Sequence, residues 1–136
     1  MSHKRKRQPA SPMQAEVRVM DPSAEYYTPE GCHINELSNT GADPDASIAR
    51  ARVPAGAATR WHRLRGITER YVVLSGTGTM EVGELPAQRV AVGDVVLIPP
   101  GCRQRITSGA DEDLVFLAIC TPRFRPEVYE DIDGGS

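Results

Sequence analysis

The sequence predicts an all-β fold, built as an antiparallel sandwich or barrel of short strands. Short runs rich in β-branched and other apolar residues alternate with turn residues along most of the chain. This spacing is typical of antiparallel strands joined by tight turns. No long stretch of the sequence repeats its apolar residues at the spacing of a helix, which disfavours a mixed fold with helices between the strands.

Nine segments are expected to be strands. In chain order they are residues 32–37, 46–53, 59–64, 69–75, 78–82, 88–90, 95–98, 103–107 and 114–120. Glycine and proline set the backbone angles that turns require and interrupt strands. The breaks expected on this basis are Pro54-Ala55-Gly56, Gly76-Thr77-Gly78, Gly93-Asp94, Pro99-Pro100-Gly101 and Ser108-Gly109.

The length and the composition of the ends predict a single domain with tails. A chain of 136 residues lies in the range of one domain. Residues 1–20 begin with a basic, proline-containing stretch that includes Lys4 and Arg7, and a stretch of this kind buries too little apolar surface to order itself. We therefore expect a disordered basic tail over residues 1–20, a β-barrel over 28–125 and a C-terminal tail over 126–136.

Charge and cysteine content exclude several classes of partner. With 16 Lys and Arg against 18 Asp and Glu, the chain has no field that would attract nucleic acid or an anionic membrane. No apolar run reaches the length of a membrane helix, and the N-terminus lacks the apolar stretch of a secretory signal. We expect a cytoplasmic protein whose three cysteines, Cys32, Cys102 and Cys120, are reduced thiols.

Three of the expected strands are apolar on both faces. They are residues 72–74, 95–98 and 114–119. A sheet with one wet face would alternate apolar and polar side chains. Another surface must therefore cover the outer face, and a second copy of the chain is the simplest cover, so we expect a homodimer.

Two blocks of residues carry the strongest functional signal. The first places Gly56, His62, Glu69 and Gly76 at fixed spacing, and the second places Gly93, Pro99, Gly101 and Gln104 in the same way. Over residues 32–122 these blocks resemble the paired motifs of the cupin superfamily, especially the small single-domain bacterial cupins labelled mannose-6-phosphate isomerase-like. The resemblance implies a jelly-roll β-barrel. Leu64, Gln104 and Ser108 depart from the family pattern, which has two histidines and an asparagine there.

The strand pattern places candidate site residues on one face. Residues two apart on a strand point the same way, so His62 and Leu64 share a face. If residues 65–68 form a hairpin loop, His62 lies opposite Tyr71 and diagonal to Glu69. The family match places Gln104 beside them. His62 and Glu69 are the candidate catalytic residues.

The resemblance implies a divalent metal, Zn, Mn, Fe or Ni, held by His62, Glu69 and Gln104. Imidazole and carboxylate are good ligands for these ions, and an amide oxygen is a weaker one. Leu64 removes a donor where cupin metalloenzymes have a histidine. The alternative is a metal-free site, in which Glu69 marks the pocket because a carboxylate inside a barrel needs a partner to offset its desolvation.

The expected ligand is a small molecule in a pocket inside the barrel. Arg60, Leu64, Tyr71 and Ile106 are the expected pocket residues, with Arg60 either binding an anionic group or pairing with acids at the rim. One possible function is a metal-dependent isomerase, lyase or dioxygenase acting on an oxygen-rich metabolite. The others are a metal-free binding protein or acid–base enzyme that uses His62 and Glu69, and a structural cupin without catalysis.

Overall fold

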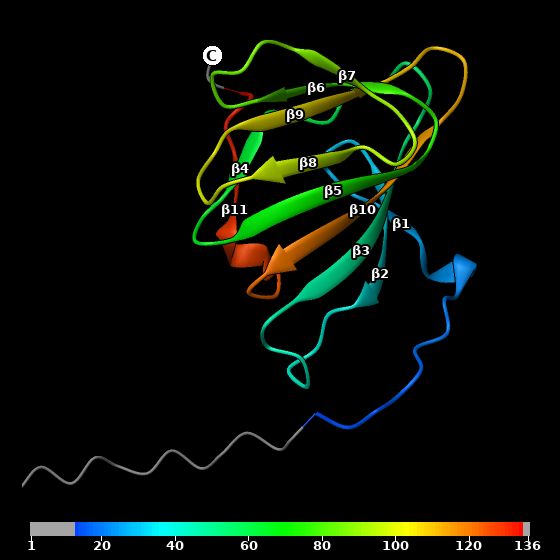
Figure 1. Ribbon diagram of the computed structural model, residues 1–136, viewed down its shortest axis with the longest axis vertical. Coiled ribbons are helices and arrows are strands. Elements are labelled where there is room, and N and C mark those ends of the chain that lie inside the picture. The colour runs from blue at the N-terminus through cyan, green and yellow to red at the C-terminus, as the bar shows by residue number, and fades with distance from the viewer. Residues whose placement is uncertain (1–12, 135–136) are drawn as a thin grey trace, which may run out of the picture.

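The computed structural model describes residues 13–134, and these residues form two antiparallel sheets that face each other. The strands can be followed by colour in Figure 1. They are β1 Tyr26–Tyr27, β2 His33–Ser38, β3 Ser47–Val53, β4 His62–Leu64, β5 Thr68–Ser75, β6 Gly78–Val82, β7 Gln88–Val90, β8 Val95–Ile98, β9 Gln104–Ser108, β10 Leu114–Thr121 and β11 Tyr129–Asp131. Two 3₁₀ helices, η1 Pro22–Ala24 and η2 Pro126–Val128, flank them.

The strand order confirms the predicted all-β jelly-roll fold. One sheet has six strands in the order β1-β2-β3-β10-β5-β8, and the other has five in the order β11-β4-β9-β6-β7. The two sheets are separate in their hydrogen bonding and are not closed into a single barrel. All nine predicted strands are present, with ends that differ by no more than a few residues.

Alternation along the strands places the core between the sheets. In β5 the buried side chains are Glu69, Tyr71 and Val73, while their neighbours are less buried. Successive strand residues point to opposite faces, so these three share the inner face. The main apolar cluster joins both sheets and includes Val53, Phe116 and Ile106. A smaller cluster around Leu64, Ile67 and Cys120 lies apart from it.

The predicted hairpin between the third and fourth expected strands is wrong. His62 of β4 pairs with Gln104 of β9 in the five-stranded sheet, whereas Glu69 of β5 pairs with Cys120 of β10 and with Ile98 of β8 in the six-stranded sheet. The connection through Gly66, which has a φ of 70°, therefore crosses from one sheet to the other. His62 and Glu69 approach the interior from opposite sheets and are not neighbours on one sheet.

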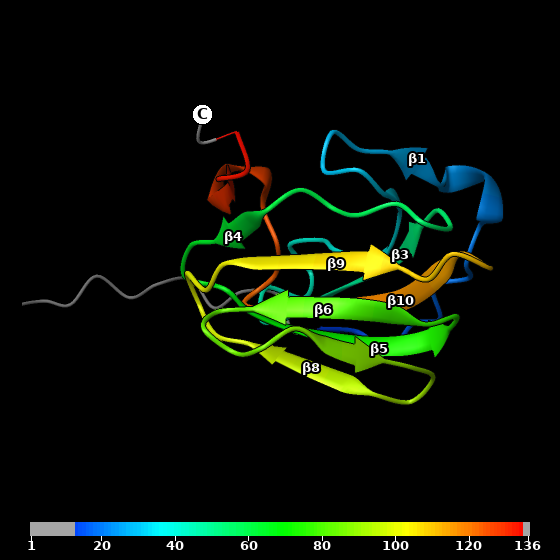
Figure 2. The same ribbon diagram turned by 90° about the horizontal axis from the view of Figure 1, so that it is seen from above.

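Both ends of the described chain contribute strands that the sequence did not predict. We expected a tail from residue 126, but the segment forms η2 and then β11, which pairs with β4 from Tyr129 to Asp131. In Figure 2 this red segment lies next to β4. Near the other end, β1 pairs with β2. Of the predicted N-terminal tail, residues 1–12 lie outside the described residues, and residues 13–20 are exposed without regular structure.

Neither short helix within residues 13–134 has the length and apolar character needed to cross a membrane.

Candidate functional site

A cavity of about 340 Å³ opens between the two sheets. Its wall is mostly apolar and includes Ile34, Ala49, Ala51, Ala118, Phe116 and Leu64. The polar groups come from elements far apart in the chain: Glu30, Glu36, Asn39, Ser47, His62, Glu69, Tyr71 and Tyr129. An apolar cavity with a few converging polar groups is the usual form of a small-molecule site.

His62 is buried at the start of β4, and its orientation is fixed. Its Nδ1 lies 2.6 Å from the backbone carbonyl oxygen of Arg60. A carbonyl oxygen only accepts, so Nδ1 carries a proton and donates it. The other nitrogen, Nε2, lies 3.3 Å from Oε1 of Glu30. The ring also stacks on Tyr129, with centroids 5.3 Å apart. These contacts hold one imidazole nitrogen toward the Glu30 carboxyl group.

Glu30 is a site residue that the sequence did not predict, and Tyr129 is another. It lies in the turn after β1, where the Gly31 amide donates to the Thr28 carbonyl oxygen and the Arg60 amide donates to that of Glu30. Burial raises the pKa of the Glu30 carboxyl group, and the neighbouring His62 lowers it by less. The side chain is still 23% exposed, so it is reached through the cavity. No motif spacing ties this turn to β4, and its only sequence signal is an acidic residue between Pro29 and Gly31.

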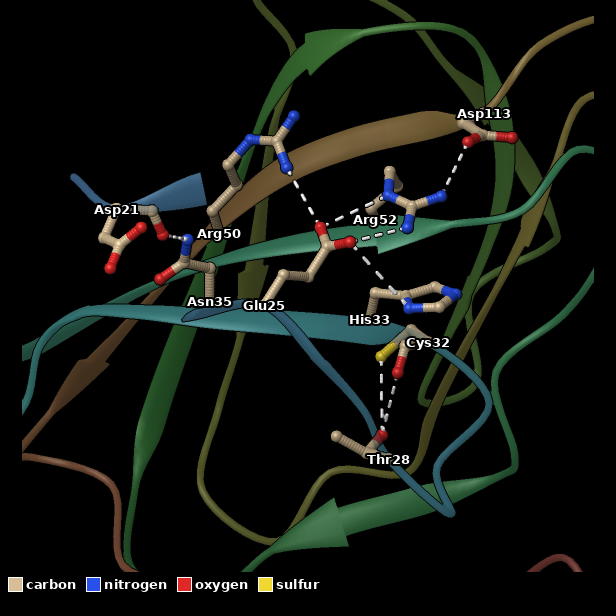
Figure 3. Close-up of polar contacts among 9 residues, drawn as sticks. All are labelled: Asp21, Glu25, Thr28, Cys32, His33, Asn35, Arg50, Arg52 and Asp113. Carbon is tan, nitrogen blue, oxygen red and sulfur yellow. Dashed lines mark hydrogen bonds and ion pairs between the residues drawn. The ribbon is translucent and has the colours of Figure 1, made fainter. Parts of the chain in front are cut away.

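The segment that carries Glu30 is anchored on the outer face of the six-stranded sheet. Glu25, just before β1, accepts hydrogen bonds from Arg52 at 2.6 and 3.2 Å and from Arg50 at 3.3 Å. Figure 3 shows these bonds, with His33 beside Glu25 and Asp113 on the far side of Arg52. The Arg52 hydrogen bonds lower the pKa of the Glu25 carboxyl group. Glu25 therefore fastens the N-terminal segment to β3.

Three buried side chains form a chain of hydrogen bonds that joins the two sheets through Gln104, the strand partner of His62. The Tyr71 hydroxyl donates to Oε1 of Gln104 at 2.6 Å, and Nε2 of Gln104 donates to Oε1 of Glu69 at 2.9 Å. Burial raises the pKa of Glu69 to about 8, although the hydrogen bond from Gln104 lowers it. Glu69 is therefore largely protonated at pH 7 and can supply a proton. Its other oxygen, Oε2, lies 3.9 Å from the sulfur of Cys120.

The donor atoms fit a bound metal ion poorly. The amide oxygen of Gln104, its only good ligand atom, already accepts from Tyr71. His62 could offer Nε2, since its Nδ1 donates to a backbone carbonyl oxygen as in many metal-binding histidines, but Nε2 faces Glu30. Among residues 13–134 no three His, Cys, Asp or Glu side chains are grouped to hold a metal. Leu64 is buried on the same face of β4 as His62, where a further imidazole would be needed.

The expected pocket residues divide into two pairs. Leu64 and Tyr71 line the cavity as expected. Arg60 and Ile106 do not. Arg60 lies at the surface and pairs with Asp131 of β11, which is the second of the two roles considered for it, whereas the prediction for Ile106 is corrected. Ile106 is fully buried in the main apolar cluster.

Comparison with known proteins places the chain in a family. The family model described as "Cupin domain" matches residues 49–120. The chain is also 31% identical over 107 residues to an uncharacterized protein, MJ1618, of Methanocaldococcus jannaschii, a match that covers 77% of this chain and 85% of the relative. The protein therefore belongs to the cupin family.

Solved structures share the fold at lower identity. Pac13 of Streptomyces, described as a nucleoside dehydratase, is 16% identical, with a TM-score of 0.70 over 87% of this chain and 92% of its own. KdgF from Halomonas is 17% identical, with a TM-score of 0.67 over 77% and 94% of the two chains. Oxalate decarboxylase of Bacillus subtilis is 20% identical, with a TM-score of 0.67 over 78% of this chain and 29% of its own.

Proposed function

We propose that the protein binds a small, oxygen-rich metabolite in the cavity and acts on it by acid–base chemistry that needs no metal ion. The observation that carries this proposal is the His62–Glu30 pair, with Nε2 and Oε1 3.3 Å apart at the wall of the cavity. A histidine whose second nitrogen is fixed by a backbone carbonyl group is held ready to exchange a proton.

The two sides of the cavity suit two roles. The His62–Glu30 pair can accept a proton from a substrate carbon. Glu69, protonated because burial raises its pKa to about 8, can supply a proton to a departing hydroxyl group. If both steps act on one substrate, a C–H and a C–O bond break, a double bond forms and water leaves. An elimination of water is therefore favoured over an oxidation, since neither step transfers electrons to an acceptor.

The relatives support this reaction class without establishing it. Pac13, which shares the fold at a TM-score of 0.70, is described as a nucleoside dehydratase, and a dehydratase carries out such an elimination. The metal-dependent alternative places a divalent ion on His62, Glu69 and Gln104. The hydrogen bonds that occupy the Gln104 amide count against it.

A ligand screen tests the proposal. Ligand-observed NMR against a broad panel of polar metabolites, with the full chain, should yield ligands whose binding is lost in His62→Asn and weakened in Glu30→Gln. Product formation would then be followed in the same samples. The proposal would be overturned by ligands whose affinity is the same for both variants as for the wild type, or by a panel that yields no ligand. Binding that requires His62 but gives no product would instead favour the non-catalytic binding protein.

The homodimer and the cytoplasmic location stay predictions. The outer face of the six-stranded sheet carries Leu74, Val95 and Leu97, which are 44%, 57% and 69% exposed. A second copy of the chain would cover them, because paired edge or face contacts between identical sheets are self-complementary. Multi-angle light scattering should give twice the chain mass for the wild type and the monomer mass for Leu97→Asp. A monomeric wild type would contradict the prediction.

A further inference from the structure

Acidic side chains line the cavity, and His62 is the one basic side chain among the described residues of its wall. Three glutamates, Glu30, Glu36 and Glu69, belong to its wall, and among the described residues neither arginine nor lysine does. An anion placed in such a cavity would lose its hydration without gaining a cationic partner.

Several arginines among residues 13–134 have their partners outside the cavity. Arg50 and Arg52 bind Glu25 on the outer face, and Arg60 binds Asp131 at the surface. Arg123 donates to Asn39 at the rim but does not line the cavity. Positive charge on His62 would be balanced by Glu30, 3.3 Å from its Nε2. Within residues 13–134, no arginine or lysine therefore lines the cavity to receive a phosphate or carboxylate group.

Tyr129 offers a buried hydrogen-bonding group that no described residue uses. Its ring lines the cavity and stacks on His62. Its hydroxyl oxygen is buried and has no hydrogen-bond partner among the described residues. An unpaired buried hydroxyl costs free energy, and such groups in folded proteins usually have a partner. An oxygen atom of a ligand beside His62 would supply it.

We infer that the cavity selects an uncharged molecule bearing hydroxyl or carbonyl groups, with one apolar or aromatic face, and that Tyr129 donates a hydrogen bond to one of its oxygens. The apolar face would lie against the alanine residues 49, 51 and 118 and against Phe116. The inference rests on the proposed function and specifies its substrate class. Unphosphorylated nucleosides and neutral sugars belong to the class, while nucleotides and sugar acids do not.

Matched pairs of probes test the inference. Calorimetry would measure the affinity of the full chain for uridine and uridine 5′-monophosphate, and for glucose and glucuronate. Uridine is chosen because Pac13, which has the same fold, has been solved with it. In at least one pair, the neutral probe should bind at least tenfold more tightly than its anionic counterpart. Anions that bind as tightly as the neutral probes would overturn the inference.

Two variants, each with a control, separate the effect of the Tyr129 hydrogen bond from the effect of charge at the cavity. Tyr129→Phe should weaken the binding of the neutral probe by about fivefold or more. Tyr27→Phe, at a tyrosine that is 62% exposed and outside the cavity, should leave this affinity unchanged. Glu36→Arg at the exposed rim should increase the affinity for the anionic probe about tenfold, and Glu84→Arg on the surface should not. Tyr129→Phe with wild-type affinity, or Glu36→Arg without a gain, would overturn the inference.

The outcomes also separate this inference from the proposed function. Tight binding of anions that is lost when His62 is replaced would overturn only the inferred substrate class. If none of the four probes binds while the metabolite panel yields a His62-dependent ligand, the substrate class is wrong and the proposed function stands. If the panel also yields no ligand, both fail.

Discussion

Nε2 of His62 lies 3.3 Å from Oε1 of Glu30, although the two residues belong to different parts of the fold. His62 begins β4, and Glu30 lies in the turn between β1 and β2. Because Nδ1 donates to the Arg60 carbonyl group, the lone pair or second proton of the ring is directed toward the carboxyl group. The proposed chemistry requires this pair together with Glu69, which lies in β5 of the six-stranded sheet.

Glu69→Gln should make stability less dependent on pH between about 4.5 and 8. The folded protein holds the Glu69 proton up to about pH 8, whereas the ordinary pKa is 4.5. Unfolding therefore releases a proton in this window, and the free energy of unfolding falls as the pH rises, by up to about 1.4 kcal/mol per pH unit. Urea unfolding at several pH values would measure the slope.

The matched control for this experiment is Glu84→Gln, at an exposed residue. It should keep the slope of the wild type. An equal slope in Glu69→Gln and the wild type would show that Glu69 does not hold its proton in the folded state.

Gln104→Leu should destabilise the protein by roughly 2 to 6 kcal/mol. The substitution leaves both the Tyr71 hydroxyl and an oxygen of Glu69 buried without a partner, and each such loss costs about 1 to 3 kcal/mol. Gln88→Leu on β7, where the side chain is exposed, is the control. Urea unfolding at pH 7 measures both. A change within 0.5 kcal/mol, roughly the range of a neutral surface substitution, would contradict the network.

Glu25→Gln should loosen the segment that carries Glu30. It removes the charge that binds Arg50 and Arg52, at a cost of about 1 kcal/mol because solvent reaches this cluster. The more specific result is faster amide exchange at residues 26–31 than in the wild type, measured by NMR. Exchange that is unchanged there would mean that β1 and the turn are held without Glu25.

Gly76 and Gly56 offer a test of the two turns that bracket the first motif. Both have positive φ, 79° and 74°, which costs a residue with a side chain about 1 kcal/mol or somewhat more. A Cβ atom at Gly76 would also overlap the Asp113 carbonyl oxygen, while one at Gly56 meets nothing within 4 Å. Gly76→Ala should therefore lower the melting temperature much more than Gly56→Ala, and equal effects would contradict this packing.

Much of the fold follows from local pattern, whereas part of the site depends on long-range topology. The strand from Gly78 to Val82 was predicted to its exact ends, because alternation and flanking turns are local signals. The partners of a strand are not, so β4 and β5 were wrongly joined in a hairpin. Glu30 and Tyr129 were missed for the same reason, since only the folded chain brings the turn after β1 and the C-terminal strand β11 to His62.

Elemental analysis of tag-free protein, with ligand affinity measured before and after chelation, would show whether the site works without a metal ion. We expect metal content far below one equivalent per chain and an affinity that chelation leaves unchanged, because Gln104 is bonded to Tyr71 and Glu69. Close to one equivalent of metal, lost in both His62→Ala and Glu69→Ala and required for ligand binding, would contradict it.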